Sequence, residues 1–464
     1  MRATIGLEVH VRLKTRTKLF CGCPADQEGQ PPNTVVCPIC MGYPGSKPRL
    51  NREAVTQALK VALALGCRVS PVARFSRKTY FYPDMSKNFQ ITQFEEPLAT
   101  GGGLEVKGSW IGIRRVQLEE DPARLVHLGG SGGVNIDYNR SGLPLVEIVT
   151  EPAISSTEMA REFLKALALT LEHIGVYDPR DEASLRVDAN VSVEGGARVE
   201  VKNITGYRNV ERALSFEVVR QTSALNMGVR VERETRHFDA ATGTTVPLRA
   251  KELEEDYGYI AEPDLTQIHL SEEVVARVKA AMPELPRERV QRFAAEYGLP
   301  RRQAEIIVQE GLQMSRFFEE CCRLYPSPRR VANWITTFLL KSLNYEGLRV
   351  EESRVQPHTF VELLELIDEG VISERLAKEL IKDYVATGRS PRALVREKGL
   401  GLLPREEVRA IVREVLEQQG KAVEDYRGGR VKALDFLLGQ VLRRARARAP
   451  VSLVREILLE ELEG

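Results

Sequence analysis

Four cysteines in the first 40 residues give the strongest chemical signal in this chain of 464 residues. They form two close pairs, Cys21 with Cys23 and Cys37 with Cys40, and the second pair encloses Pro38. Structural zinc sites use four donors at tetrahedral corners, which two short cysteine pairs on tight turns can supply. Because four thiolates leave no open coordination position, the pattern predicts a structural rather than a catalytic zinc ion. The alternative is four reduced, partly buried cysteines without a metal.

Carboxylates on strand-like segments give a second signal. Glu8 and His10 lie two residues apart in IGLEVHV, so a strand would point both side chains to one face. Further acidic residues stand in QLEEDPARLVH and GLPLVEIVTEP, namely Glu119, Glu120, Asp121, Glu147 and Glu151. Carboxylates and a histidine that converge from separate segments could bind Mg²⁺ together with nucleotide phosphates. The alternative is that some of them are ordinary charges on edge strands.

A third segment, FSRKTYFYPDMSKNFQITQ, mixes cations with aromatic rings. Its members are Arg77, Lys78, Lys87, Tyr80, Phe81 and Tyr82. Such a mixture could bind phosphates and stack a base, although it is also a common packing feature of strands. The chain contains no G-x-x-x-x-G-K-[ST] loop and no G-x-G-x-x-G after a strand. An ATP site would therefore have to work without the common phosphate loops.

The elements expected before Pro283 are short strands and two helices. SLRVDANVSVEG and ARVEVKNI alternate apolar and polar residues around a Gly-Gly turn, which predicts a hairpin. NREAVTQALKVALALG predicts a helix capped by Asn51 and ended by Gly66, and SSTEMAREFLKALALTLEHIG predicts one ended by Gly175. This half is typical of a mixed domain with a largely antiparallel sheet.

The chain after Pro283 is helical in pattern almost throughout, with a further break at EKGLGLLP. We therefore predict an α+β protein with a sheet-containing domain over 1–282, an all-α domain over 283–400 and a small helical tail over 401–464. The 66 basic and 65 acidic residues nearly cancel, so any nucleic-acid footprint must be local. No apolar run of about 18 residues and no signal peptide is present, so we expect a cytoplasmic protein without a membrane contact.

Longer motifs resemble the B subunit of the bacterial and archaeal Asp/Glu-tRNA amidotransferases. The opening IGLEVHVRLKTRTKLFCGCP is followed in order by NTVVCPICMGYPGSKPRLN, RKTYFYPDMSKNFQITQ, EEDPARLVH, NRSGLPLVEIVTEP, SLRVDANVSV and EVKNI. ANWITTFLLKSLN stands in the helical part, and KAVEDYRGGRVKALDFLLGQVL resembles the YqeY-like domain that ends this family of chains. The resemblance covers essentially the whole chain.

The resemblance implies a cradle-shaped catalytic domain, a helical domain and a tail that holds tRNA. It also implies an ATP-dependent carbon–nitrogen ligase with glutamine as amide donor. The side-chain carboxylate of Glu-tRNA(Gln) or Asp-tRNA(Asn) is phosphorylated with ATP and Mg²⁺, and ammonia then displaces the phosphate. The implied partners are a glutamine-hydrolysing amidase (the A subunit), a small C subunit and the misacylated tRNA.

Carried over by motif, the implied magnesium ligands are Glu8, His10, Glu120 and Glu147, and the last three are the implied catalytic residues. We further predict nucleotide contacts from Lys78, Tyr80 and Lys87. The cysteine set is complete here, whereas some members of the family have lost it, which favours Zn²⁺ at Cys21, Cys23, Cys37 and Cys40. Tail arginines that could contact tRNA phosphates are Arg427, Arg430, Arg443, Arg444, Arg446 and Arg448.

Two other classes of function fit parts of this pattern. One is a tRNA-binding scaffold whose cradle has lost catalysis, against which His10, Glu120 and Glu147 argue. The other is a zinc-containing ligase that acts on a small molecule and would not need the tail. The choice between Glu-tRNA and Asp-tRNA as substrate is not encoded in these motifs.

Overall fold

The computed structural model describes residues 2–128, 133–250, 258–446 and 448–463. It divides into two units, Met1–Pro286 and Arg287–Gly464, each with its own packing. The first unit contains the strands and the second is helical, so the predicted α+β fold class is confirmed.

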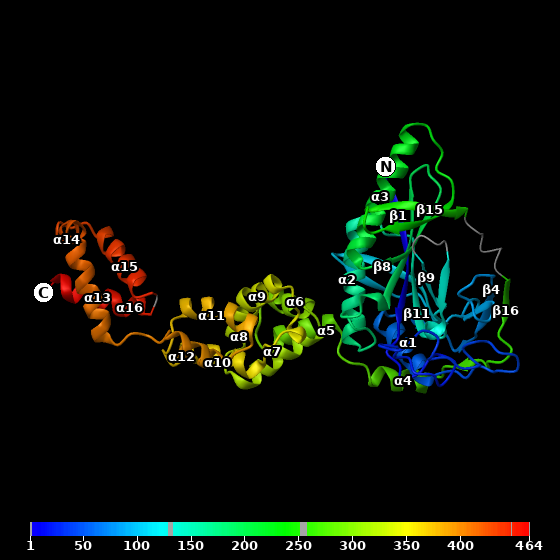
Figure 1. The fold of residues 1–464 in the computed structure, drawn as a ribbon, viewed down its shortest axis with the longest axis horizontal. Helices are drawn as coiled ribbons and strands as arrows, with labels where there is room; N and C mark the ends of the chain where they lie inside the picture. Colours follow the sequence, from blue (N-terminus) through cyan, green and yellow to red (C-terminus); the bar gives the residue numbers. More distant parts are fainter. Residues whose placement is uncertain (1, 129–132, 251–257, 447, 464) are drawn as a thin grey trace. The chain divides into compact units, whose positions relative to one another are not determined.

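The first unit is built on one large, mostly antiparallel sheet in the order β15-β14-β13-β12-β1-β11-β8-β6-β2, with β7 paired to β8 (Figure 1). Its strands are β1 (Ala3–Arg12), β2 (Arg68–Val69), β6 (Ala99–Thr100), β7 (Gly103–Val106), β8 (Ser109–Glu120), β11 (Pro144–Thr150), β12 (Leu185–Val193), β13 (Val199–Thr205), β14 (Glu234–Asp239) and β15 (Thr244–Ala250). The pair β13–β14 is parallel. The predicted hairpin is formed by β12 and β13.

Smaller pairings flank this sheet. They involve β3 (Val72–Ala73), β4 (Ser76–Thr79), β5 (Phe89–Thr92), β9 (Arg124–His127), β10 (Val134–Asp137), β16 (Gly258–Ala261) and β17 (Ile268–His269). The strand β4 lies between β5 and β16, which brings Lys78 and Tyr259 opposite each other.

Helices α1 (Arg52–Ala64), α2 (Thr157–His173), α3 (Tyr207–Asn226) and α4 (Glu272–Ala280) complete this unit. The Asn51 side chain caps α1 as predicted, and Ser156 caps α2. In β1 the buried apolar residues are Ile5, Leu7, Val9 and Val11, which share one core with α1, α2 and α3. Because side chains alternate along a strand, Glu8 and His10 point to the opposite face. The helices thus bury one face of the sheet and leave a polar face.

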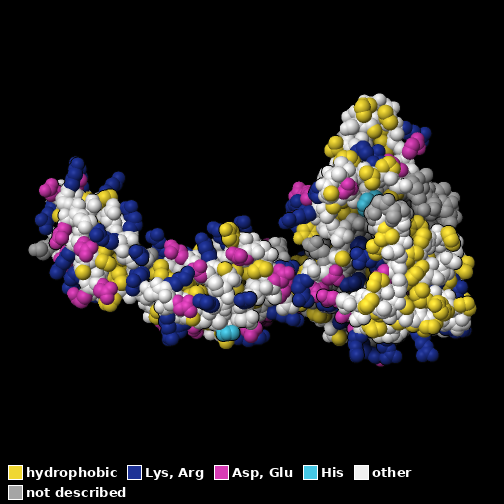
Figure 2. Space-filling model, viewed as in Figure 1, with side chains coloured by type: hydrophobic (Ala, Val, Ile, Leu, Met, Phe, Trp, Pro, Cys, Tyr) yellow, Lys and Arg dark blue, Asp and Glu magenta, His cyan; other side chains and the backbone are white. Residues whose placement is uncertain are grey.

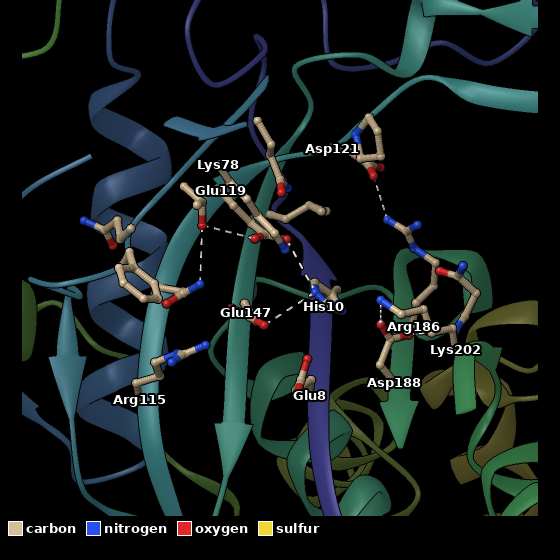
Figure 3. Close-up of a pocket in the computed structure, with 18 of the residues that line it drawn as sticks. Glu8, His10, Lys78, Arg115, Glu119, Asp121, Glu147, Arg186, Asp188 and Lys202 are labelled. Atoms are coloured by element: carbon tan, nitrogen blue, oxygen red, sulfur yellow. Dashed lines mark hydrogen bonds and ion pairs between the residues drawn. The ribbon is translucent and has the colours of Figure 1, made fainter. Parts of the chain in front are cut away.

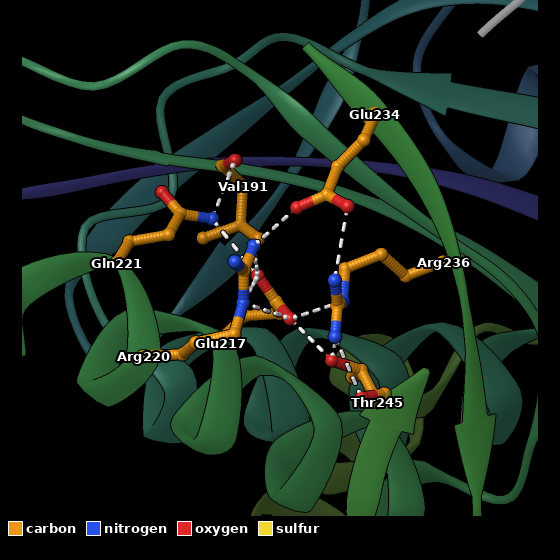
Figure 4. Close-up of polar contacts among 7 residues, drawn as sticks. All are labelled: Val191, Glu217, Arg220, Gln221, Glu234, Arg236 and Thr245. Carbon is orange, nitrogen blue, oxygen red and sulfur yellow. Dashed lines mark hydrogen bonds and ion pairs between the residues drawn. The ribbon is translucent and has the colours of Figure 1, made fainter. Parts of the chain in front are cut away.

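A buried carboxylate ties α3 to β14 and to the edge strand β15 (Figure 4). Glu217 is fully buried and lies 2.9 Å from Arg220 and 3.1 Å from Arg236, and it accepts a hydrogen bond from Thr245. Glu234 bridges the same two arginines at 2.8 and 2.9 Å. Burial opposes ionisation, but the bonds from Arg220 and Thr245 prevail and lower the pKa of Glu217.

Replacing this buried carboxylate should destabilise the first unit. We expect Glu217→Gln to cost about 3 kcal/mol, because two arginines lose part of their neutralising charge inside the fold. A carboxyl whose pKa is lowered by folding stabilises above its unfolded pKa of about 4.3, and that contribution is lost as the pH falls through the folded value. Calorimetry should therefore show a large difference from the unaltered protein at pH 7 and a smaller one below about pH 4.

The matched control is Glu211→Gln on the same helix, where a partly exposed ion pair with Arg161 should contribute less than about 1 kcal/mol. Equal melting temperatures of the Glu217 variant and the unaltered protein at pH 7 would contradict the stabilising role of Glu217 and its two arginines.

The second unit consists of α5 (Pro286–Glu296), α6 (Arg301–Gln309), α7 (Leu312–Leu324), α8 (Pro328–Trp334), a π-helical turn (Ile335–Leu339), α9 (Leu340–Glu346), α10 (Pro357–Asp368), α11 (Glu374–Thr387), α12 (Pro391–Lys398), α13 (Arg405–Gln418), α14 (Gly420–Arg427), α15 (Lys432–Arg444) and α16 (Val451–Glu463). It has two separate apolar cores, one spanning 293–395 and the other 408–462. Among the described residues, no helix combines the length and apolar character needed to cross a membrane.

Candidate active site

The polar face of the large sheet forms one wall of a cavity of ≈ 250 Å³ in the first unit. Five adjacent strands contribute alternate residues: Glu200 and Lys202 from β13, Arg186 and Asp188 from β12, Glu8 and His10 from β1, Glu147 from β11, and Arg115, Gln117 and Glu119 from β8. Lys78, Tyr80, Phe94 and Tyr259 also line it. A dense set of charged side chains from distant parts of the chain thus meets in one place.

The strand register explains why these side chains converge. His10 pairs with Glu147 on one side and with Arg186 on the other, while Glu8 pairs with Asp188. His10 Nε2 lies 3.4 Å from Glu119 Oε1 and 3.7 Å from Glu147 Oε1. Figure 3 shows His10 directed toward both Glu147 and Glu119, with Glu8 further along the same strand.

The cavity concentrates negative charge around this histidine. Burial and the neighbouring carboxylates, Glu147 first among them, raise the pKa of Glu8 to about 7. Burial and Glu119 likewise raise the pKa of Glu147. Burial alone would lower the pKa of His10, but the carboxylates of Glu119 and Glu147 outweigh it and raise it. Carboxylates held this close favour a bound cation, which would offset their mutual repulsion.

A second acidic group lies beside the first. One oxygen from each of Glu8, Asp188 and Glu200 lies within 4.8 Å of the others, close enough to bind one metal ion together. Asn190 donates to Glu8 at 3.0 Å and helps to orient it. The donors are oxygens with one imidazole nearby, a set that suits Mg²⁺ or Mn²⁺ better than a soft metal.

Several polar atoms in the cavity wall could pair with a ligand. The Nε of Arg115, the Oε1 of Gln117 and the Nε2 of Gln93 are buried and have no hydrogen-bond partner within the described part of the chain. Such atoms are costly unless something pairs with them. A ligand that carries anionic and hydrogen-bonding oxygens, such as a nucleotide phosphate, would satisfy the guanidinium and the amide nitrogen.

Five of the predicted site residues come together here, and two lie elsewhere. Glu8, His10, Glu147, Lys78 and Tyr80 line the cavity. Glu120 and Lys87 do not line it, and they instead form a nearly buried ion pair with N–O distances of 2.5 and 2.6 Å. Consecutive residues of a strand point to opposite faces, so Glu119 occupies the position in the cavity that the motif comparison suggested for Glu120.

Sequence reasoning missed several residues of the cavity: Arg115, Gln117, Arg186, Asp188, Glu200 and Lys202. Their signal was present, because every second residue of SLRVDANVSV is polar and the partner strand carries Glu200 and Lys202 two residues apart. Such alternation more often marks a face exposed to solvent, so it did not by itself indicate a site.

The four cysteines near the N-terminus also come together. One sulfur from each of Cys21, Cys23, Cys37 and Cys40 lies within 4.8 Å of the others, and none is in a disulfide. Zinc–sulfur bonds of about 2.3 Å would place tetrahedral sulfurs about 3.8 Å apart, and the sulfurs of Cys37 and Cys40 are 3.9 Å apart. The donor set therefore fits Zn²⁺.

The surroundings of Cys40 favour its thiolate form. A hydrogen bond from Cys21 lowers the pKa of Cys40 to about 5 and raises that of Cys21. The backbone N–H of Cys37 donates to Cys40 Sγ at 3.1 Å, and the fully buried ammonium of Lys18 lies 3.7 Å from it. Donors directed at a sulfur stabilise its anionic form, which is the form that binds metal.

The fold and cavity define a protein of two units whose mostly antiparallel sheet carries a cluster of carboxylates beside cationic side chains. The catalytic-domain model of the GatB/GatE family matches residues 3–276, and a GatB domain matches 316–462. The B subunit of the aspartyl/glutamyl-tRNA(Asn/Gln) amidotransferase from Thermotoga maritima is 44% identical, covering all of this chain and 99% of its own. The B subunit of the same name from Thermomicrobium roseum is 46% identical over 99% of this chain and 98% of its own. The chain belongs to this GatB/GatE family of amidotransferase B subunits.

Proposed function

We propose that this chain activates the side-chain carboxylate of a misacylated tRNA for amidation, as the B subunit of a glutamine-dependent amidotransferase. The substrate is Glu-tRNA(Gln), Asp-tRNA(Asn) or both, and ATP is the phosphoryl donor. The observation that carries the proposal is the cavity itself. In it, His10 lies 3.4 Å from Glu119 and 3.7 Å from Glu147, and Lys78 and Arg115 line the same cavity. Family membership supports the same activity.

The chemistry requires a better leaving group than oxide. An oxygen of the substrate carboxylate attacks the γ-phosphorus of ATP, the bond to ADP breaks, and an acyl phosphate forms. Ammonia then attacks the acyl carbon, phosphate leaves, and the nitrogen loses a proton to give the amide. Phosphoryl transfer depends mainly on positioning and on positive charge near the transferring oxygens, so no side chain need act as a nucleophile.

The residues of the cavity divide these tasks. His10, Glu119 and Glu147 would hold Mg²⁺, and Glu8 with Asp188 and Glu200 would hold a second divalent ion. When bound, these ions neutralise charge on the phosphates and orient them.

The remaining side chains of the cavity would bind and orient the substrate. Arg115 and Lys78 would bind phosphoryl oxygens, and Tyr80 would contact the nucleotide. Glu120 and Lys87, which pair with each other outside the cavity, would act indirectly.

The other parts of the chain would assemble and hold the complex. Residues 1–282 would form the catalytic cradle, with structural Zn²⁺ at Cys21, Cys23, Cys37 and Cys40. Residues 283–400 would form a helical domain, and residues 401–464 a tail that binds tRNA. The glutaminase partner (the A subunit) would supply ammonia, a small C subunit would complete a heterotrimer, and the complex would work in the cytoplasm.

Reconstitution tests this function directly. The chain would be combined with its amidase partner, misacylated tRNA, glutamine and ATP, and Gln-tRNA or Asn-tRNA would be measured. We expect product only when ATP is present, and we expect misacylated tRNA to stimulate release of phosphate from ATP. Equal product without ATP, or equal amidation of free glutamate and aspartate, would contradict carboxylate activation on tRNA.

A further inference from the structure

The carbonyl oxygen of Cys40 connects the cysteine cluster to the segments that lead into the cavity strands. It accepts hydrogen bonds from Ser86 Oγ at 2.7 Å and from Ser141 Oγ at 3.2 Å, and the two hydroxyls are 3.2 Å apart. Ser86 precedes β5, and Ser141 precedes β11, the strand that carries Glu147. The cluster is thus bonded to two segments 46 and 101 residues away in sequence.

The next link is the buried ion pair between Lys87 and Glu120. The turn after Cys40 rests against the stem of Lys87, because a Cβ at Gly42 would lie only 2.3 Å from Lys87 Cγ. A Cβ at Gly142 would lie 3.5 Å from Cys40 Cβ and 4.0 Å from Glu120 Oε2. The side chains of Lys87 and Glu120 are only 11% and 5% exposed, so the pair has little room to move.

Glu120 in turn holds the end of β8. Its carboxylate accepts the backbone N–H of Ile91 at 2.8 Å, and its carbonyl accepts Gln90 Nε2 at 2.8 Å. Glu119 is the preceding residue on the same strand and points into the cavity toward His10. Because neighbouring residues of a strand share one rigid stretch of backbone, the bonds on Glu120 determine where Glu119 is directed.

We propose that the cysteine cluster is a positioning element for Glu119, acting through Ser86, Ser141 and the Lys87–Glu120 pair. The metal-loaded cluster holds the Cys40 carbonyl in place and thereby fixes the carboxylate that meets His10. An empty or oxidised cluster leaves that carboxylate less well placed, so cation binding in the cavity depends on the state of the cysteines. This inference rests on the proposed function, in which Glu119 helps to bind a divalent ion.

The test measures Mn²⁺ binding to the full chain by electron paramagnetic resonance, with zinc content measured on the same samples. In Ser86→Ala/Ser141→Ala we expect zinc to remain at the level of the unaltered protein, while the Kd for Mn²⁺ rises about tenfold, as for other residues that orient metal ligands. Ser86→Thr keeps a hydroxyl at this position. With this substitution in place of Ser86→Ala, most of the affinity for Mn²⁺ should return. Ser46→Ala is the control, because the Ser46 hydroxyl donates within its own turn, to the carbonyl of Tyr43.

A second variant, Lys87→Gln, removes the ion pair with Glu120, which connects the cysteine cluster to Glu119. It should weaken Mn²⁺ binding to a similar degree. It keeps the test decisive if the serine pair proves necessary for folding. Removing zinc from the unaltered protein with a zinc-selective chelator should also raise the Kd for Mn²⁺. Unchanged affinity in Lys87→Gln and after zinc removal would overturn the proposal. Failure of His10→Ala to weaken Mn²⁺ binding would instead refute the proposed function.

Discussion

Replacing Glu147 with glutamine is expected to abolish ATP-dependent amidation while leaving tRNA binding nearly unchanged. Glutamine keeps the size of the side chain but removes one charge from the ligand set that faces His10 at 3.7 Å. Loss of a single preorganised electrostatic contact in an active site lowers kcat by about 10²–10³-fold, and loss of the cation should bring the effect to the upper end. Steady-state amidation by the reconstituted complex measures kcat, and filter binding measures the affinity for tRNA.

The control substitution is at Glu151, four residues after Glu147 in the sequence. Glu151→Gln alters an exposed carboxylate just beyond the end of β11 and should leave kcat within a factor of two. A comparison of Glu119→Gln with Glu147→Gln adds to the argument, since both side chains contact His10. Retained amidation in Glu147→Gln would exclude the proposed magnesium site.

Deleting residues 404–464 should raise the Kd for misacylated tRNA about 10–100-fold, because each lost phosphate contact also loses its share of counterion release. The tail has its own apolar core over 408–462, so the core over 293–395 should remain folded after the deletion. The salt dependence of tRNA binding should become shallower in proportion to the contacts removed. Fluorescence anisotropy over a series of salt concentrations measures both quantities.

The arginines of the tail are not equivalent in the structure, which allows a finer version of this test. Arg405, Arg409 and Arg413 are paired with glutamates of α16, and Arg448 donates to the Gly401 carbonyl. The face drawn in Figure 2 shows basic and acidic side chains intermixed over these helices. Arg427 and Arg446 are exposed and have no ion pair in the part of the chain that the structure describes.

Arg427→Gln/Arg446→Gln should therefore reproduce part of the loss of tRNA affinity. Arg413→Gln, at an arginine already neutralised by Glu461, is the matched control and should cause little loss. Magnesium-dependent ATP binding should be unchanged in the deletion, as expected if the tail only holds the substrate. A truncated chain that binds and amidates tRNA normally would favour a ligase acting on a small molecule.

Local signals in the sequence predicted much of the fold. Asn51 and Gly66 mark the limits of α1 because a cap and a helix end depend on a few neighbouring residues. The hairpin of β12 and β13 follows from strict alternation around a Gly-Gly turn. The four cysteines likewise lie on two short turns, and they converge once these two turns come together.

The composition of the cavity depended on contacts that no local pattern specifies. Glu119 and Glu120 are identical in type and adjacent in sequence, and only the burial of the opposite face of β8 against the helices decides which one meets His10. Lys87 was a reasonable phosphate contact by composition, yet its partner is a carboxylate 33 residues away.

The sequence by itself therefore determined the family, the helix and strand segments and the cysteine pairs, because each depends on short stretches of chain. The tertiary structure decided the members and orientation of the carboxylate site, because five strands from residues 3 to 205 must pair in register before their polar faces coincide. It also decided that the cysteine cluster is hydrogen-bonded to the segments that lead into β5 and β11, at one backbone carbonyl that no side-chain pattern predicts.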